Sequence, residues 1–108
     1  MKRFDVRYLP EAIKFLENIE IKAAEKLIYN ISKSQAINDT RIFKKLKSSN
    51  IWEFRAEYNS NEYRLFAFWD KQQNTLIVCT HGVKKKTQKT PKKEIEKAEQ
   101  LRKKYLGL

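Results

Sequence analysis

Apolar and polar residues repeat with two different periods along this chain, and these periods predict both strands and helices. Between Arg3 and Tyr8 apolar side chains alternate with polar ones, which predicts a half-buried strand. Pro10 then permits a helix to begin, because proline is well tolerated at the first helical position. We expect this helix to run from Pro10 to about Asn18. Its inward-facing residues would be Ile13, Leu16 and Phe15.

A second amphipathic helix is predicted from about Ile21 to Lys33, so that the two helices form a hairpin. Its apolar residues follow the spacing i, i+3, i+4, i+7, at Ala24, Leu27, Ile28 and Ile31. The stretch from Gln35 to Asn50 is polar and basic, and we interpret it as a loop or a short helical turn. Its apolar anchors are taken to be Ile42, Phe43 and Leu46.

The second half of the chain predicts a three-stranded antiparallel meander followed by a helix. Two strands, around residues 52–57 and Tyr63–Trp69, are joined by the turn residues 59–61. A turn at residues 71–74 leads into a third strand, Leu76–Val83. A final helix from Pro91 to about Leu106, with Thr90 as its N-cap, has acidic residues early and basic residues late, which suits the helix dipole. Its inward face would be Ile95, Ala98, Leu101 and Tyr105.

This order of elements, β-α-α-β-β-β-α, defines an α+β fold. The chain has 108 residues, only two glycines and two prolines, and no internal repeat, which favours one domain over residues 1–108. Cys79 is the only cysteine, so no intramolecular disulfide forms, and its apolar neighbours indicate a buried reduced thiol. No apolar stretch is long enough to span a membrane, and the N-terminus lacks the apolar core of a signal peptide. We therefore expect a cytoplasmic protein that does not contact a membrane.

Charge changes this picture, because the net charge is +11 and the sequence pI is about 9.8. Ten basic and three acidic residues lie between Lys84 and Lys104, so this segment holds +7 of the net charge. A balance of this kind favours an anionic partner such as nucleic acid. Lys84, Lys85, Lys86 and Lys89 lie where the last strand gives way to the last helix, and this junction is suited to binding phosphate. A run of lysines is more often a solvated face, which is the alternative for this cluster.

Three sequence segments together resemble one known family. They are W-E-F-R at Trp52–Arg55, E-Y-R-L-F at residues 62–66, and H-G-V-K-K-K-T-Q-K-T-P at His81–Pro91. In this order and spacing they resemble the RelE/ParE superfamily of small bacterial toxins, and within it the phage-derived HigB-like branch of type II toxin–antitoxin modules. The resemblance implies a small twisted antiparallel sheet with two helices packed on it and a terminal helix.

The same resemblance implies a function. RelE-like members cleave mRNA in the ribosomal A site without a metal, whereas ParE-like members poison DNA gyrase. The implied partners are the ribosome with its mRNA and a cognate antitoxin, acidic or of the helix-turn-helix type. No cofactor and no metal are expected. The leading interpretation is a ribosome-dependent mRNA endoribonuclease, and the alternatives are a non-catalytic gyrase inhibitor or nucleic-acid-binding module of the same fold, or a degenerate phage relic.

Cutting RNA through its own 2′-hydroxyl needs a base, a cation that stabilises the charge on phosphorus, and a donor for the leaving 5′-oxygen. Arg64 interrupts an apolar strand and matches the phosphate-stabilising arginine of the family; its alternative is an ion pair with Glu53 or Glu57. Arg55 lies where RelE-like members carry a catalytic basic residue, and a cross-strand salt bridge explains it equally well.

Lys85 falls where the family has its second essential cation, and Lys84, Lys86 and Lys89 would bind RNA beside it. Because crowded cations lower one another's pKa, one lysine of the run is a candidate base near neutral pH. His81 is the only histidine and a candidate general acid or base, or else a satisfied strand-end residue. The chain departs from related toxins in having no histidine or aromatic residue after the lysine run before Tyr105, which we assign to helix packing.

Overall fold

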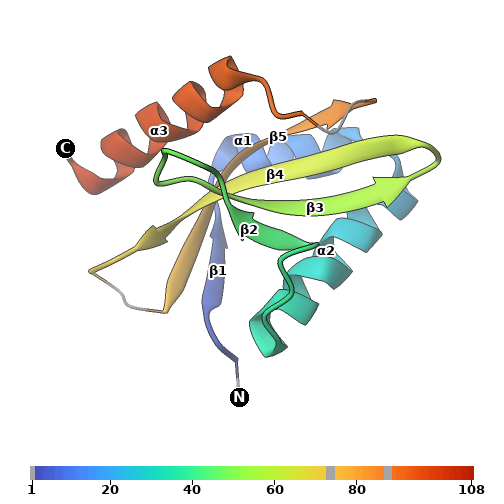
Figure 1. Ribbon diagram of the computed structural model, residues 1–108, viewed down its shortest axis with the longest axis horizontal. Coiled ribbons are helices and arrows are strands. Elements are labelled where there is room, and N and C mark those ends of the chain that lie inside the picture. Colours follow the sequence, from blue (N-terminus) through green and yellow to red (C-terminus); the bar gives the residue numbers. More distant parts are fainter. Residues whose placement is uncertain (1, 73–74, 87–88) are drawn as a thin grey trace.

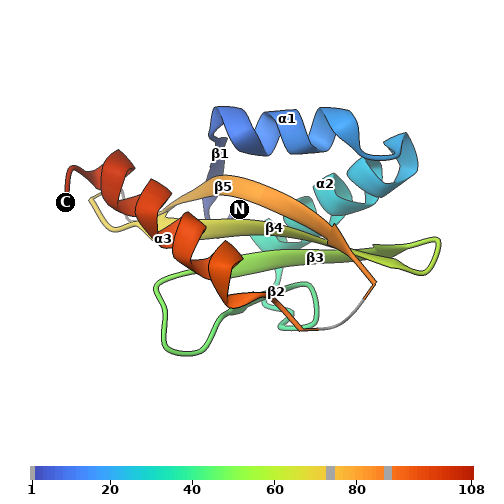
Figure 2. The same cartoon turned by 90° about the horizontal axis from the view of Figure 1, so that it is seen from above.

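A five-stranded sheet runs through the middle of the molecule, with helices on both of its faces (Figures 1 and 2). The fold is that of a computed structural model, which describes residues 2–72, 75–86 and 89–108. The elements in chain order are β1 (Asp5–Tyr8), α1 (Pro10–Asn18), α2 (Ile21–Ala36), β2 (Phe43–Lys45), β3 (Trp52–Tyr58), β4 (Asn61–Asp70), β5 (Leu76–Lys85) and α3 (Lys92–Leu106). The α+β class and the antiparallel meander of β3, β4 and β5 confirm the prediction from sequence.

Two features of the sheet differ from the prediction. The strand order is β1-β5-β4-β3-β2, and β1 pairs with β5 in parallel, while the other pairs are antiparallel. Strand β2 lies in the segment interpreted as a loop or helical turn. Its three residues are too few for a visible alternation, and a tertiary contact fixes them as a strand. The ring of Phe43 stacks on that of Phe54, its cross-strand partner, with the ring centroids 4.2 Å apart.

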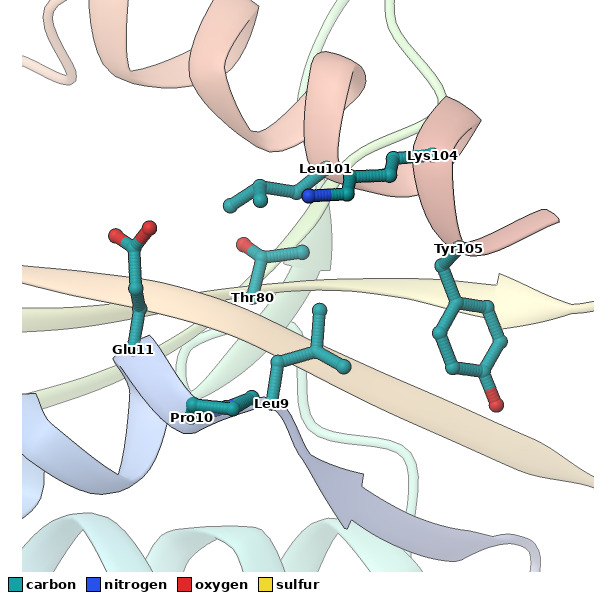
Figure 3. A pocket seen from close by; sticks show the side chains of 7 residues that line it. All are labelled: Leu9, Pro10, Glu11, Thr80, Leu101, Lys104 and Tyr105. Atoms are coloured by element: carbon teal, nitrogen blue, oxygen red, sulfur yellow. The ribbon is translucent and has the colours of Figure 1, made fainter. Parts of the chain in front are cut away.

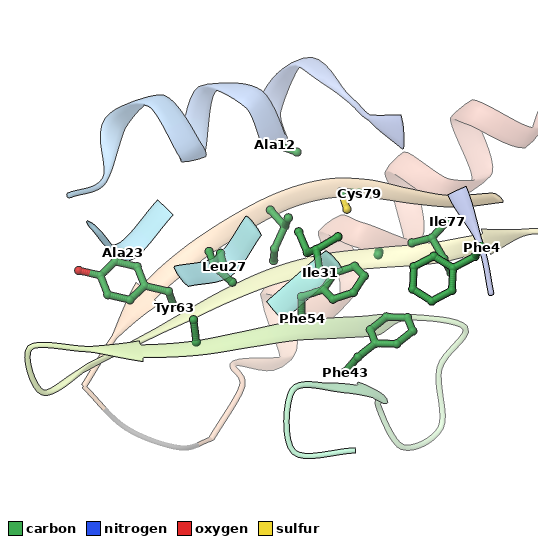
Figure 4. Close-up of a cluster of buried hydrophobic side chains, with 13 residues drawn as sticks. Phe4, Ala12, Ala23, Leu27, Ile31, Phe43, Phe54, Tyr63, Ile77 and Cys79 are labelled. Carbon is green, nitrogen blue, oxygen red and sulfur yellow. The ribbon is translucent and has the colours of Figure 1, made fainter. Parts of the chain in front are cut away.

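Helices α1 and α2 cover one face of the sheet and enclose the larger hydrophobic core (Figures 2 and 4). The bounds of α1 are those predicted, and α2 extends three residues beyond Lys33. Their inward faces were predicted only in part: Leu27 and Ile31 are buried and Phe15 and Leu16 pack against the core, but the prediction was wrong for Ile13 and Ile28. Ile13 is 46% exposed and Ile28 is 42% exposed, whereas Ala12 and Ala23 are buried. The buried residues of α2 are Ala23, Leu27, Asn30, Ile31 and Ser34.

Small and polar side chains explain this rotation of the helices. Ala12 and Ala23 let the helix backbones come close to the sheet, which larger side chains would prevent. Ser34 donates a hydrogen bond to the carbonyl of Asn30, and the Asn30 amide donates to the carbonyl of Arg55 on β3. With these polar groups satisfied, the face that contains them is buried in place of the more apolar face that includes Ile28.

Helix α3 crosses the opposite face of the sheet and packs on a second core formed mainly by β4 and β5. Ala98 is fully buried, and Ile95 and Tyr105 pack against this core, as predicted. The ring of Tyr105 meets that of Phe68 at 5.5 Å in an edge arrangement, which confirms its packing role. Thr90 is not the N-cap: Pro91 holds that position and makes no side-chain capping bond.

A β-bulge in β5 decides which side chains face α3. Leu65 pairs with Gly82 but Ala67 pairs with Cys79, so the register shifts between these two pairs. Thr80 and His81 consequently both lie on the α3 side, since Thr80 lines a pocket with α3 and His81 contacts Glu94 of α3. Beyond the bulge, side chains still alternate between the two faces of the sheet, but odd-numbered residues now take the face that even-numbered residues take before it.

Candidate functional site

Three cations from adjacent strands meet on the α3 side of the sheet, where the strands extend past the N-terminal end of α3. We call Arg55 of β3, Arg64 of β4 and Lys85 of β5 the cationic cluster. Arg55 and Arg64 are direct cross-strand partners, and Lys85 is the partner of Glu62. Strand alternation and the bulge bring these side chains to one face, although 30 residues of sequence separate the first from the last.

Glu53 holds the two arginines together. Its side chain is fully buried, and its Oε1 accepts a hydrogen bond of 2.6 Å from Nη1 of Arg64. Nε of Arg55 lies 3.1 Å from the same oxygen. Oε2 of Glu53 accepts a hydrogen bond of 3.0 Å from the hydroxyl of Thr90. The ion pair with Glu53 that was the alternative role for Arg64 is therefore present, and the salt bridge of Arg55 runs to its own strand.

Arg64 is fully buried and has further partners. Its Nη2 donates to Oε1 of Glu62 at 3.2 Å, and its Nη1 donates to the Thr90 hydroxyl at 3.2 Å. Two carboxylates and a hydroxyl thus surround this guanidinium. An arginine held by planar, charge-assisted hydrogen bonds has a fixed orientation, so it presents its positive charge to the site without the entropy loss of ordering a free side chain.

Lys85 differs from both arginines because its Nζ atom is buried and makes no hydrogen bond with any residue in the described ranges. Loss of hydration lowers the pKa of Lys85 below its ordinary value of 10.5. The positive charges of Arg64 and Arg55 lower this pKa further, while the carboxylates of Glu53 and Glu62 oppose the effect. Lys85 therefore loses its proton at a lower pH than an ordinary lysine does.

The other lysines of the run are not brought into the cationic cluster. Lys84 points to the opposite face, where its Nζ lies 3.5 Å from Oε1 of Glu20 and 5.8 Å from the centre of the Tyr63 ring. Lys86 and Lys89 are exposed. Strand β5 runs to Lys85, two residues beyond the predicted end, so Lys84 and Lys85 belong to a strand with alternating faces.

His81 is 4% exposed and lies under α3. Its Nε2 is 3.2 Å from Oε1 of Glu94, and its Nδ1 is 3.1 Å from the Thr80 hydroxyl. Burial lowers the pKa of His81 below its usual range, and the hydrogen bond with Glu94 partly offsets this. Four residues along a strand span about 13 Å, so His81 lies well away from Lys85. The structure does not bring His81 into the cationic cluster.

Two surface hollows of about 380 Å³ each have different linings. The first lies between the start of α1, β5 and the end of α3 and is mostly apolar (Figure 3). No member of the cationic cluster lines it. The second, which we call the edge groove, lies between α2, β3 and β4 and is lined by both Arg55 and Glu62, together with Lys26, Asn30 and Arg41. Arg55 is therefore the member of the cationic cluster that borders the edge groove.

Glu53, Glu62 and Thr90 complete the site, and the sequence did not assign them to it. Glu53 alternates with the apolar residues of its strand and so belongs to the polar strand face, and Thr90 was predicted to be the N-cap of the last helix. The only signal for Glu53 was its place as a candidate partner of Arg64. Within the described ranges no group of three or more His, Cys, Asp or Glu side chains is arranged to hold a metal ion, and no helix is long and apolar enough to cross a bilayer.

The fold is similar to that of a chain in the toxin–antitoxin complex RelBE2 from Mycobacterium tuberculosis. The match has a TM-score of 0.57 at 18% sequence identity and covers 81% of this chain and 97% of that chain. No protein of curated function matches the sequence. The model of the family "phage derived protein Gp49-like" matches residues 14–103. The chain belongs to this phage-derived Gp49-like family.

Proposed function

We propose that this protein is the toxin of a type II toxin–antitoxin module, of the HigB-like branch, and that it cuts mRNA on the ribosome. The observation that carries the proposal is Lys85, a lysine with a lowered pKa and a buried nitrogen beside two guanidinium groups. The Gp49-like family and the fold shared with a chain of a toxin–antitoxin complex support it.

The proposed reaction uses the RNA's own 2′-hydroxyl as the nucleophile. The neutral amine of Lys85 accepts the proton of this hydroxyl as the oxygen attacks phosphorus. The bond from phosphorus to the 5′-oxygen breaks as that oxygen takes a proton from solvent, leaving a 2′,3′-cyclic phosphate and a 5′-hydroxyl. Arg55, which is partly exposed at the edge groove, binds the phosphate oxygens and donates a hydrogen bond to the leaving 5′-oxygen, while buried Arg64 adds positive potential from behind.

The basic surface around the site suits a bound strand of RNA. Lys26 and Arg41 line the edge groove, and Lys86 and Lys89 are exposed on the segment that leads to α3. Contacts of this kind with phosphates position a nucleic acid without reading its sequence. The ribosome would then present the mRNA, and an antitoxin of the helix-turn-helix type would hold the toxin inactive.

Inducible expression of Lys85→Met in a bacterial host tests the proposal, with Lys84→Met as the matched control. The two variants remove one charge each from neighbouring residues, but only Lys85 faces the cationic cluster. We expect the parent and Lys84→Met to arrest growth and to create new mRNA 5′ ends within translated frames. Lys85→Met is expected to lose roughly 100-fold or more of the cutting, as for removal of a general base.

Arg64→Ala is a less useful test, since it would remove the nearest cation from the buried carboxylate of Glu53 and cost about 3–5 kcal/mol of folding free energy. Growth arrest by the parent without new mRNA ends would contradict the nuclease. Double-strand DNA breaks accompanying such arrest would identify gyrase as the target. No arrest by the parent would favour a degenerate relic or a binding module.

A further inference from the structure

We infer that Glu53 is the positioning residue of this site, and that through Thr90 it joins the cationic cluster to the start of α3. The inference deepens the proposed function and rests on it for the catalytic consequence. The structural consequence is that the pKa of Lys85 and the order of the first turn of α3 depend on Glu53. Both can be measured in the protein alone, without RNA.

The first argument comes from the two oxygens of Glu53, which have different partners. Oε1 faces both guanidinium groups, at 2.6 Å from Arg64 and 3.1 Å from Arg55. Oε2 accepts the Thr90 hydrogen bond. A fully buried carboxylate is stable only when its charge is paired and its lone pairs are used, and these contacts supply both conditions.

The second argument is the repulsion between the arginines. Arg55 and Arg64 are direct cross-strand partners, and like charges in this position destabilise a sheet. The carboxylate oxygen that they share attracts both guanidinium groups and offsets their mutual repulsion, so the two groups lie side by side. Without this charge, we expect Arg55, the more exposed of the two, to swing outward into the edge groove.

The third argument concerns Thr90, whose hydroxyl accepts a hydrogen bond from Arg64 and donates one to Glu53. Thr90 therefore contacts the cationic cluster and does not cap α3, and the helix begins two residues later without a side-chain cap. The bond to Glu53 holds the chain that enters α3 against β3. Loss of it would free the first turn of α3 while leaving the charges of the cluster unchanged.

Glu53→Gln tests the inference, with Glu57→Gln as the matched control. Each variant removes one negative charge from β3, but Glu57 is exposed, whereas Glu53 is buried against Arg64. The readout is the NMR titration of the Lys85 side chain in the free protein. Because Glu53 raises the pKa of Lys85, we expect this pKa to fall in Glu53→Gln and to stay at the parent value in Glu57→Gln.

A second pair of variants keeps the test valid if Glu53→Gln does not fold. Thr90→Val removes the hydroxyl, and Thr90→Ser keeps it. We expect faster amide hydrogen exchange in the first turn of α3 for Thr90→Val, by roughly tenfold, the factor that corresponds to one lost hydrogen bond. Thr90→Ser is expected to exchange like the parent, and the Lys85 titration should be unchanged in both.

The outcomes separate this inference from the proposed function. Equal Lys85 titration curves in Glu53→Gln and Glu57→Gln would overturn the positioning role, as would unchanged exchange in α3 for Thr90→Val. If the titration and exchange shift as expected while the parent cuts no mRNA, the positioning role holds and the nuclease assignment fails. If the parent cuts mRNA, we expect Glu53→Gln to shift the pH profile of cutting in the same direction as the Lys85 titration.

Discussion

Lys84 and Lys85 are neighbours of identical chemistry with different environments. Lys84 reaches the carboxylate of Glu20 in solvent, whereas the amine of Lys85 is turned into the cationic cluster and loses its water. Alternation along a strand causes the difference, because successive side chains point to opposite faces. At the scale of single residues the site is thus one lysine whose pKa is lowered first by loss of hydration and then by the charges of two buried or half-buried arginines.

The lowered pKa of Lys85 gives a pH dependence with a definite sign. The amine acts as a base only when neutral, so the rate of cutting is expected to rise about tenfold per pH unit below the pKa of Lys85 and to level off above it. Because that pKa is lowered, the plateau begins at a lower pH than an ordinary lysine, with a pKa of 10.5, would give. Single-turnover cutting of ribosome-bound mRNA across a pH series measures this profile.

Lys85→Arg provides the control for this profile, because arginine keeps the positive charge but does not lose its proton. We expect Lys85→Arg to lose most of the rate of cutting and to lose the rise of this rate with pH. An unchanged rise of the rate with pH in Lys85→Arg would show that another group is the base.

The titration of Lys85 also affects folding. Between the lowered pKa of Lys85 in the folded protein and its ordinary pKa of 10.5 in the unfolded chain, the unfolded chain binds more protons. The free energy of unfolding therefore rises with pH between these two pKa values.

At the scale of elements, the bulged strand β5 does most to build the site. The bulge turns both Thr80 and His81 toward α3. It also reverses which residues of β5 face α3, and this places Lys85 on the same face as Arg64. Gly82 lies at this point, and a Cβ atom there would come within 2.3 Å of the Phe15 ring of α1. The absence of a side chain at Gly82 therefore lets α1 pack directly on β5.

Gly82→Ala is expected to destabilise the fold by about 1–3 kcal/mol, because the added methyl group overlaps the ring of Phe15. Chemical denaturation of the parent and the variant measures the loss. Phe15→Leu combined with Gly82→Ala is the matched control, since a smaller, flexible side chain relieves the overlap and should recover part of the stability. Equal losses in the single and double variants would assign the effect to the backbone of β5 instead.

At the scale of the whole molecule, the positive charge is concentrated in the C-terminal part of the sequence but is divided between surfaces by the fold. Lys85 enters the site, Lys84 lies on the helical-hairpin face, and Lys86 and Lys89 are exposed near the start of α3. A net charge of +11 attracts an anionic partner as a whole, and in the proposed function the exposed Lys86 and Lys89 contact the RNA backbone near the site.

Salt dependence distinguishes these roles. Binding of a labelled single-stranded RNA, followed by fluorescence anisotropy, is expected to weaken steeply as salt rises. Lys86→Ala and Lys89→Ala should each reduce the slope of log K against log salt by about 0.7, the value for one phosphate contact on a single strand. Lys84→Ala should leave the slope unchanged. An equal effect of all three variants would mean that the chain binds RNA through its total charge, without the surface proposed here.

The pattern of residues was sufficient to predict most of the secondary structure and the α+β class. Local periodicity gave the bounds of α1, the meander and the final helix, because these elements bury a regular set of side chains. It also identified Arg64 as unusual within an apolar strand. The lysine run was predicted to contain a lysine whose pKa is lowered by its neighbours in the run, but at Lys85 the causes are burial and the arginines of other strands.

Tertiary structure decided the rest. The inward faces of α1 and α2 depended on close packing of Ala12 and Ala23 and on the hydrogen bonds of Asn30. Strand β2 depends on its pairing with β3, where Phe43 stacks on Phe54. The parallel pairing of β1 with β5 and the bulge were equally absent from any local pattern. The site itself joins β3, β4, β5 and the approach to α3. Sequence determines which charges are available, but only the register of the strands decides which of them share a face and lose their water.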